Sequence, residues 1–264
     1  MKETMSEPSK SLIITTENDH IITLTINRPE RKNALTLAMY TEMSEVLNRC
    51  AERSEIKAVI ITGAGGAFTS GNDLMDFMKV PPTNTDTPVF HFLKALLHFP
   101  KPIIAAVDGA AIGIGTTMLL HCDLIYATPK SKFQLPFIRL GLVPEAGASL
   151  LLPHMLGHRK AAELLMLGEM FMADTAQEVG IVNEVLEAEQ LMEVVLKKAQ
   201  TLASLPPAAM RQTKALLKRV HADQIEDCMQ TEGEIFIKRL QSPETQEAFQ
   251  AFFEKRKPDF SQFD

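Results

Sequence analysis

The sequence contains few cysteines and no excess of positive charge. Its three cysteines, Cys50, Cys122 and Cys228, lie far apart and form no CxxC motif, so neither a disulfide framework nor a zinc ribbon is expected. Lysine and arginine number 27 against 33 aspartates and glutamates, which gives a formal net charge of −6. Because nucleic acids bind basic surfaces, no nucleic-acid partner is expected.

Long apolar runs are also absent. No stretch approaches the roughly 18 apolar residues of a membrane span, and residues 1–10 are too polar for a signal peptide. The final residues, SQFD, differ from a peroxisomal address of the SKL type. The hydrophobic share of 45% and the charged share of 23% are typical of a packed globular protein. We therefore expect a cytoplasmic protein without a membrane partner.

Several common site signatures are missing. The glycine-rich loops 63–71 and 109–115 contain neither GxxxxGKS/T nor GxGxxG with the expected acidic residue, so a nucleotide site of those kinds is not expected. His154 and His158 are spaced i, i+4 but lack the glutamate of HExxH, so we interpret them as surface residues and expect no metal. There is no GxSxG elbow of a serine hydrolase. The glycine loops can form tight turns or direct two backbone N–H groups at one point, and their pattern leaves both readings open.

The order of apolar runs predicts an α/β fold in which loops at strand ends carry the chemistry. A unit of strand, glycine loop and helix occurs twice, over 58–78 and 102–121. The expected strands are 12–15, 21–26, 58–62, 102–107 and 124–127. The expected helices between them are 37–53, capped by Thr36, then 73–78, 89–99 and 116–121.

From Pro153 onward the pattern is almost wholly helical. A capping box, Thr175-x-x-Glu178, predicts one short helix, and longer ones are expected near 190–204, 207–220, 224–240 and 243–255. The predicted organisation is a leader, a core and a C-terminal helical region, at 1–10, 11–200 and 201–264. Because the helical region is small and has apolar faces, we expect it to pack on the core or on a neighbouring subunit.

Glu145 stands out among the carboxylates. It lies in the segment GLVPEAG, 141–147, where apolar residues and glycines flank it in place of charges. One interpretation is a glutamate near a helix N-terminus, where the helix dipole favours negative charge. The other is a general base in an apolar pocket, whose pKa burial would raise toward neutral pH. The spacing alone favours neither.

Taken together, six segments resemble the crotonase superfamily, that is, the enoyl-CoA hydratase/isomerase family, over about residues 12–260. They are INRPERKNAL at 26–35, GAFTSGNDL at 66–74, KPIIAAVDG at 101–109, GIG at 113–115, CD at 122–123 and FEKRKP at 253–258. The resemblance implies an α/β fold, a ClpP-like spiral of ββα units with a helical C-terminal region that mediates trimerisation. It implies a homotrimer or a dimer of trimers.

The resemblance also implies an acyl-CoA thioester substrate, with coenzyme A as part of the substrate and no separate cofactor. The thioester carbonyl would accept hydrogen bonds from the amides of Ser70 and Ile114. The residues implied in coenzyme A binding are Arg28, Arg31, Lys32, Asn72 and Asp73, with Phe253, Lys255 and Lys257 reaching the coenzyme A of a neighbour. The acyl pocket would be lined by Leu74, Phe77, Thr117 and Phe137, and shaped by the loop 80–88.

The departures from the family pattern narrow the expected reaction. Hydratases carry two glutamates that activate a water, and Thr117 and Phe137 stand at those positions. Glu145 instead matches the single glutamate of Δ3,Δ2-enoyl-CoA isomerases of the Pro-Glu-Gly type, with Ala146 in place of that glycine. One carboxylate can serve as base and acid, and Phe137 would exclude competing water. The alternatives are a hydratase, hydrolase or lyase acting on an unusual acyl-CoA, or a non-catalytic acyl-CoA-binding subunit.

Overall fold

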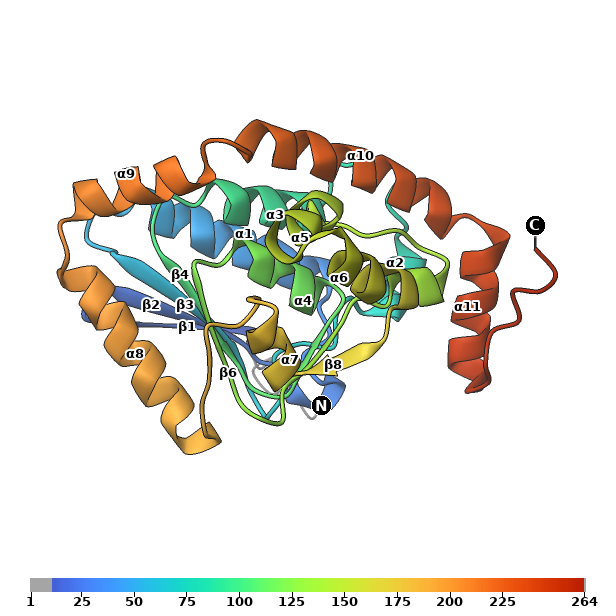
Figure 1. Cartoon of the computed structure of the whole chain (residues 1–264), viewed down its shortest axis with the longest axis horizontal. Coiled ribbons are helices and arrows are strands. Elements are labelled where there is room, and N and C mark those ends of the chain that lie inside the picture. The colour runs from blue at the N-terminus through green and yellow to red at the C-terminus, as the bar shows by residue number, and fades with distance from the viewer. Residues whose placement is uncertain (1–10, 264) are drawn as a thin grey trace, which may run out of the picture.

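The computed structural model describes residues 11–263, which form a mixed α/β fold (Figure 1). The strands are β1 (Ile13–Asn18), β2 (Ile21–Ile26), β3 (Ala58–Gly63), β4 (Ile103–Val107), β5 (Ala110–Ile112), β6 (Leu124–Ala127), β7 (Lys132–Gln134), β8 (Met170–Met172) and β9 (Glu184–Val185). A six-stranded sheet has the order β1-β2-β3-β4-β6-β9, and a three-stranded sheet has the order β5-β7-β8. In the larger sheet, β1 and β2 are antiparallel and every other neighbouring pair is parallel. The predicted leader, 1–10, lies outside the described residues.

The helices surround the larger sheet. They are α1 (Leu37–Glu52), α2 (Leu74–Lys79), α3 (Pro88–His98), α4 (Ile114–Thr117), α5 (Ala148–Leu156), α6 (His158–Ala162), α7 (Ala173–Glu178), α8 (Ala188–Ser204), α9 (Pro207–Lys218), α10 (Ala222–Leu240) and α11 (Pro243–Glu254). Short helical turns are η1 (Pro29–Arg31), η2 (Met118–His121), η3 (Phe137–Leu140) and η4 (Glu163–Leu167). None of the helices within residues 11–263 is long and apolar enough to cross a membrane.

Alternate residues of the central strands enter two separate cores. Val59 and Ile61 of β3 belong to the larger core, which also contains buried residues of α1 and α3. Ile60 belongs to a smaller core with Leu191 and Val195 of α8. Successive side chains of a strand point to opposite faces, so α8 covers one face of the sheet and α1 and α3 the other. Figure 1 shows this arrangement, with α9 and α10 continuing along the edge of the molecule from α8 towards α11.

The structure confirms the α/β fold and corrects several local expectations. The region after Pro153 is not wholly helical, because it contains β8 and β9. The predicted capping box is wrong: α7 begins at Ala173, so Thr175 lies inside the helix. The second glycine loop contains the short strand β5, which pairs with β7. The proposed division at residue 200 falls within α8, which packs on the sheet, and the division stays a prediction.

Candidate active site

Two neighbouring cavities lie near Glu145 and near the glycine loops, respectively. The first, of about 280 Å³, is bordered by Glu145 and the loop 80–88, and we call it the Glu145 cavity. The second, of about 700 Å³, is bordered by both glycine loops, η3 and α11, and we call it the amide cavity. Phe77 of α2 and Phe236 of α10 line both cavities. The two cavities therefore lie on either side of these aromatic rings.

The Glu145 cavity is mostly apolar, and α10 forms part of its wall. Its apolar lining includes Leu37, Phe77, Val80, Pro81, Phe90, Phe236 and Ile237. Gly233 of α10 also lines it, and a Cβ atom placed there would lie only 2.0 Å from Cζ of Phe90. A glycine in a helix interior destabilises the helix by about 1 kcal/mol relative to alanine. Here the glycine leaves room for the Phe90 ring.

Glu145 is a buried carboxyl group with an unpaired oxygen. Its side chain is 6% exposed, and Oε1 has no hydrogen-bond partner within residues 11–263. Burial, reinforced by the negative charge of Glu232, raises the pKa of Glu145 to about 8, with the Thr117 hydroxyl acting in the opposite direction. A carboxyl group with a pKa near the working pH can both take up and release a proton.

Glu145 does not serve the N-terminus of a helix. It precedes α5, which begins at Ala148, and the amides of Gly147 and Ser149 at that helix start donate to Glu232 instead. Ala146 and Gly147 have positive φ angles of 63° and 72°, so the chain turns sharply after Glu145. The structure therefore does not fit the helix N-terminus interpretation, and it places Glu145 beside an apolar cavity.

The two positions at which hydratases carry glutamates hold no acid. Thr117 is fully buried at the end of α4. Its hydroxyl lies near Glu145, but within residues 11–263 no atom is placed to form a hydrogen bond with Oγ1. Phe137 is 5% exposed, lines the amide cavity and packs edge-on against Phe236, with ring centroids 6.5 Å apart. Neither position therefore provides a carboxylate that could hold a water together with Glu145.

The predicted oxyanion donor Ser70 is corrected by the structure. The Ser70 amide donates to the carbonyl oxygen of Lys32 at 3.0 Å, so it is already used. Within residues 11–263, neither the Asn72 amide nor the Ile114 amide makes a hydrogen bond. Both residues line the amide cavity, and Ile114 is the first residue of α4, where amides have no partner within the helix. The available pair is therefore Asn72 and Ile114.

Gly71 allows the two glycine loops to approach each other. Its φ angle is 92°, and a Cβ atom there would lie 2.8 Å from the carbonyl oxygen of Ile112. Thr69 exchanges backbone hydrogen bonds with both neighbours of Ala111, since its amide donates to Ala110 and its carbonyl accepts from Ile112. These contacts fix the Asn72 and Ile114 segments on one wall.

The predicted coenzyme A residues divide into two groups. Five of them line the amide cavity, namely Arg31, Lys32, Asn72, Asp73 and Phe253, and so do Leu74 and Phe77 of the predicted acyl pocket. Arg28 does not: its guanidinium donates to the carboxylate of Asp73 at 2.7 Å and to the Ala34 carbonyl at 3.0 Å. Partial burial opposes ionisation of Asp73, but the hydrogen bond from Arg28 lowers its pKa. This ion pair joins the 28–34 loop to the start of α2, and the coenzyme A contact expected of Arg28 stays a prediction.

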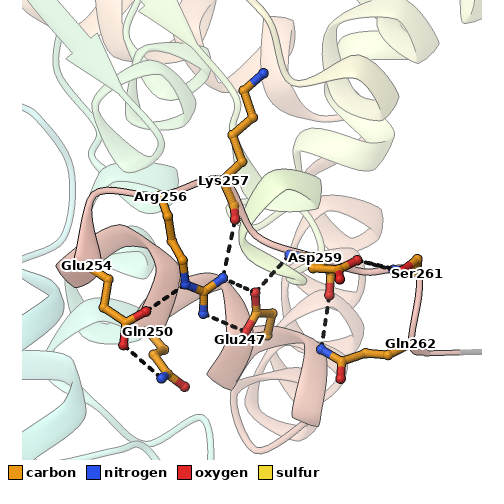
Figure 2. A network of polar contacts seen from close by, with 8 residues as sticks. All are labelled: Glu247, Gln250, Glu254, Arg256, Lys257, Asp259, Ser261 and Gln262. Atoms are coloured by element: carbon orange, nitrogen blue, oxygen red, sulfur yellow. Dashed lines mark hydrogen bonds and ion pairs between the residues drawn. The ribbon is translucent and has the colours of Figure 1, made fainter.

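The segment after α11 is held by Arg256 (Figure 2). Its guanidinium lies between the carboxylates of Glu247 and Glu254, and the hydrogen bond that it donates to Glu247 lowers the pKa of that carboxyl to about 2. Figure 2 shows the Lys257 side chain extending away from this network. Lys255 and Lys257 are exposed and do not line either cavity, whereas Phe253 lines the amide cavity of its own chain.

Comparison with known proteins gives consistent matches along the chain. The solved structure of Pseudomonas aeruginosa OdaA is 45% identical, covers 92% of this chain and 99% of its own, and superposes with a TM-score of 0.90. Enoyl-CoA delta isomerase 2 of Rattus norvegicus is 35% identical over 84% of this chain, and the chain spans 59% of that relative's length. Short-chain-enoyl-CoA hydratase of Clostridium acetobutylicum is 31% identical over 93% of this chain and 95% of its own.

The family model covers both glycine loops, Glu145 and the C-terminal helices. The model of the family described as enoyl-CoA hydratase/isomerase covers residues 16–263, nearly all of the described chain. Its members named above include both an isomerase and a hydratase. The chain belongs to the enoyl-CoA hydratase/isomerase family, that is, to the crotonase superfamily.

Proposed function

We propose that the protein is a Δ3,Δ2-enoyl-CoA isomerase in which Glu145 is the single acid and base. The observation that carries this proposal is one buried carboxyl group, with its pKa raised to about 8, facing an apolar cavity. The absence of acids at Thr117 and Phe137 supports it, because addition of water needs groups that hold and activate a water.

The proposed reaction moves one proton from C2 to C4 of the acyl chain. The Glu145 carboxylate removes a proton from C2 of a 3-enoyl-CoA, and the electron pair spreads over C2, C4 and the thioester oxygen as a dienolate. The protonated Glu145 then returns the proton to C4, which leaves the double bond between C2 and C3. The amides of Asn72 and Ile114 would donate hydrogen bonds to the dienolate oxygen, a contribution of a few kcal/mol each.

The two cavities fit the two parts of such a substrate. The apolar Glu145 cavity would hold the acyl chain, and the amide cavity would hold the thioester and the start of coenzyme A near Arg31 and Lys32. Lysine and arginine side chains bind phosphate groups through charge-assisted hydrogen bonds. Phe137 would keep water from the dienolate. No cofactor other than the coenzyme A of the substrate is needed for this chemistry.

The proposal includes a cytoplasmic homotrimer or dimer of trimers. At the end of α9 and just after it, Leu216, Leu217 and Val220 are 65%, 80% and 67% exposed. Neighbouring exposed apolar side chains of this size are typical of surfaces that bind another protein. A second copy of the chain is the proposed partner at this surface.

The test is product analysis by NMR in deuterated water, with trans-3-hexenoyl-CoA and, separately, trans-2-hexenoyl-CoA as substrates. We expect the 3-enoyl thioester to convert into the conjugated 2-enoyl thioester, with no 3-hydroxyacyl product from either substrate. Dominant hydration or thioester cleavage would show that Glu145 positions a water, and would replace isomerisation with one of those reactions. Binding without any turnover of an acyl-CoA panel would support a non-catalytic subunit.

The raised pKa of Glu145 predicts a pH dependence for kcat/KM. Proton removal from C2 requires the ionised carboxylate, and burial holds the pKa of Glu145 at about 8. The value of kcat/KM should therefore rise from pH 6 with a single ionisation, reach half its maximum near pH 8 and level off above about pH 9. Initial rates of hexenoyl-CoA isomerisation across this range measure it. A midpoint near pH 4.5 would contradict the proposal, because that is the value of an exposed glutamate.

A further inference from the structure

Glu232 of α10 is a second buried carboxylate beside the candidate base. It is 6% exposed, and its two oxygens accept hydrogen bonds from the Gly147 amide at 2.7 Å and the Ser149 amide at 2.8 Å. Gly147 lies two residues after Glu145. A carboxylate from the C-terminal region therefore binds the turn on which the base is carried.

The same turn is held from its other side by His121. Burial lowers the pKa of His121 to about 4, so its ring is neutral near pH 7, and Nε2 lies 2.8 Å from the carbonyl oxygen of Ala146. A carbonyl only accepts, so Nε2 carries the proton and donates it. Ala146 has the positive φ angle that non-glycine residues rarely adopt. Hydrogen bonds on both sides keep the chain in this conformation.

We propose that Glu232 is a positioning residue for Glu145: it ties the 145–149 turn to α10 and places a second carboxylate beside the base. The inference rests on the proposed role of Glu145 as the acid and base. If Glu232 has this role, the pKa and the position of Glu145 both depend on the contact between α10 and the 145–149 turn.

The groups around Glu145 support an electrostatic role for Glu232. Thr117 faces it from α4, and Tyr40 lies near it from α1, since burial and then the charge of Glu145 raise the pKa of Tyr40. His121, which binds the neighbouring residue, is neutral. Glu232 is the charged group among them, and like charge disfavours ionisation. Removing its charge should therefore lower the pKa of Glu145.

The experiment measures the Glu145 titration directly, without substrate, by NMR of the full chain labelled with ¹³C-glutamate at the carboxyl carbon. Glu145→Gln assigns the resonance. In Glu232→Gln we expect the midpoint of the Glu145 titration to fall by about one pH unit. The rise of kcat/KM with pH should shift to lower pH by the same amount. The matched control is Glu234→Gln, an exposed glutamate on the same helix, which should leave both unchanged.

A second variant separates charge from position. Glu232→Asp keeps the charge but shortens the side chain, so it should leave the Glu145 midpoint near its wild-type value while kcat falls as the turn loses its hydrogen bonds. An unchanged Glu145 midpoint in Glu232→Gln would overturn the proposal. If the glutamine variant does not fold, an unchanged kcat in Glu232→Asp would overturn it. If the midpoint moves as expected but the wild type isomerises nothing, the proposed function fails and the electrostatic link between the two carboxylates stands.

Discussion

Replacing Glu145 by glutamine is expected to lower kcat for isomerisation by about 10³-fold or more, within the range that general acid and base groups contribute. Glutamine has nearly the same size and fits the same buried site, but it cannot take a proton from C2 or return one to C4. Initial rates with trans-3-hexenoyl-CoA measure the loss. The exposed Glu178, changed to glutamine, is the matched control and should retain full activity.

The stability of the same variant shows whether lost activity reflects lost folding. In the wild type, burial raises the pKa of Glu145 to about 8, above the usual 4.5 of a glutamate. The protonated form therefore favours folding, and this contribution is lost as pH rises from about 4.5 through about 8. Glutamine carries no charge, so Glu145→Gln should be at least as stable as wild type at pH 9. Unfolding midpoints at pH 5 and pH 9 measure this, and retained activity in the folded variant would refute the role of Glu145.

The parts of the fold that the sequence predicts well are those with a strong local pattern. The strands β3 and β4 are buried on both faces, so they read as continuous apolar runs bounded by turn residues. The helix α1 begins with Thr36, whose hydroxyl accepts from the Met39 amide as expected of a capping residue. The strands β5, β7, β8 and β9 have two or three residues each, too few to show a period.

The candidate site was predictable only where a single residue carried the signal. Glu145 could be found because a carboxylate among apolar residues and glycines is unusual. Which amide of this loop is unpaired could not be predicted, because it depends on whether the distant Lys32 carbonyl accepts from Ser70 or from Asn72. That pairing follows from how two loops pack, which local sequence does not encode.

Glu232 was missed because it lies in a helix rich in charged residues, where glutamates usually face water. Its neighbour Gly233 is the signal that could have found it. A glycine in a helix interior is unfavourable unless another group approaches closely, and Phe90 does so. Glu232, one residue away, is buried against the start of α5, where it accepts hydrogen bonds from the amides of Gly147 and Ser149.

Replacing Ile114 by proline is the sharpest test of the amide pair, and it should lower kcat by about 10² to 10³-fold. Proline lacks the N–H that would stabilise the dienolate oxygen. Ile114 is the first residue of α4, a position where proline is well tolerated, and Gly113 before it has no Cβ to clash with the proline ring.

The control for this variant is Ile114→Ala, which keeps the amide and removes most of the same buried side chain, 1% exposed in the wild type. Both variants lose core packing, at about 2 to 5 kcal/mol of stability for such a truncation, so they should unfold at similar temperatures. Only the proline variant should lose most of kcat. Its affinity for saturated hexanoyl-CoA should change far less, because negative charge develops on the thioester oxygen only as the proton leaves C2. Equal kcat values in the two variants would show that the Ile114 amide does not bind the reacting carbonyl.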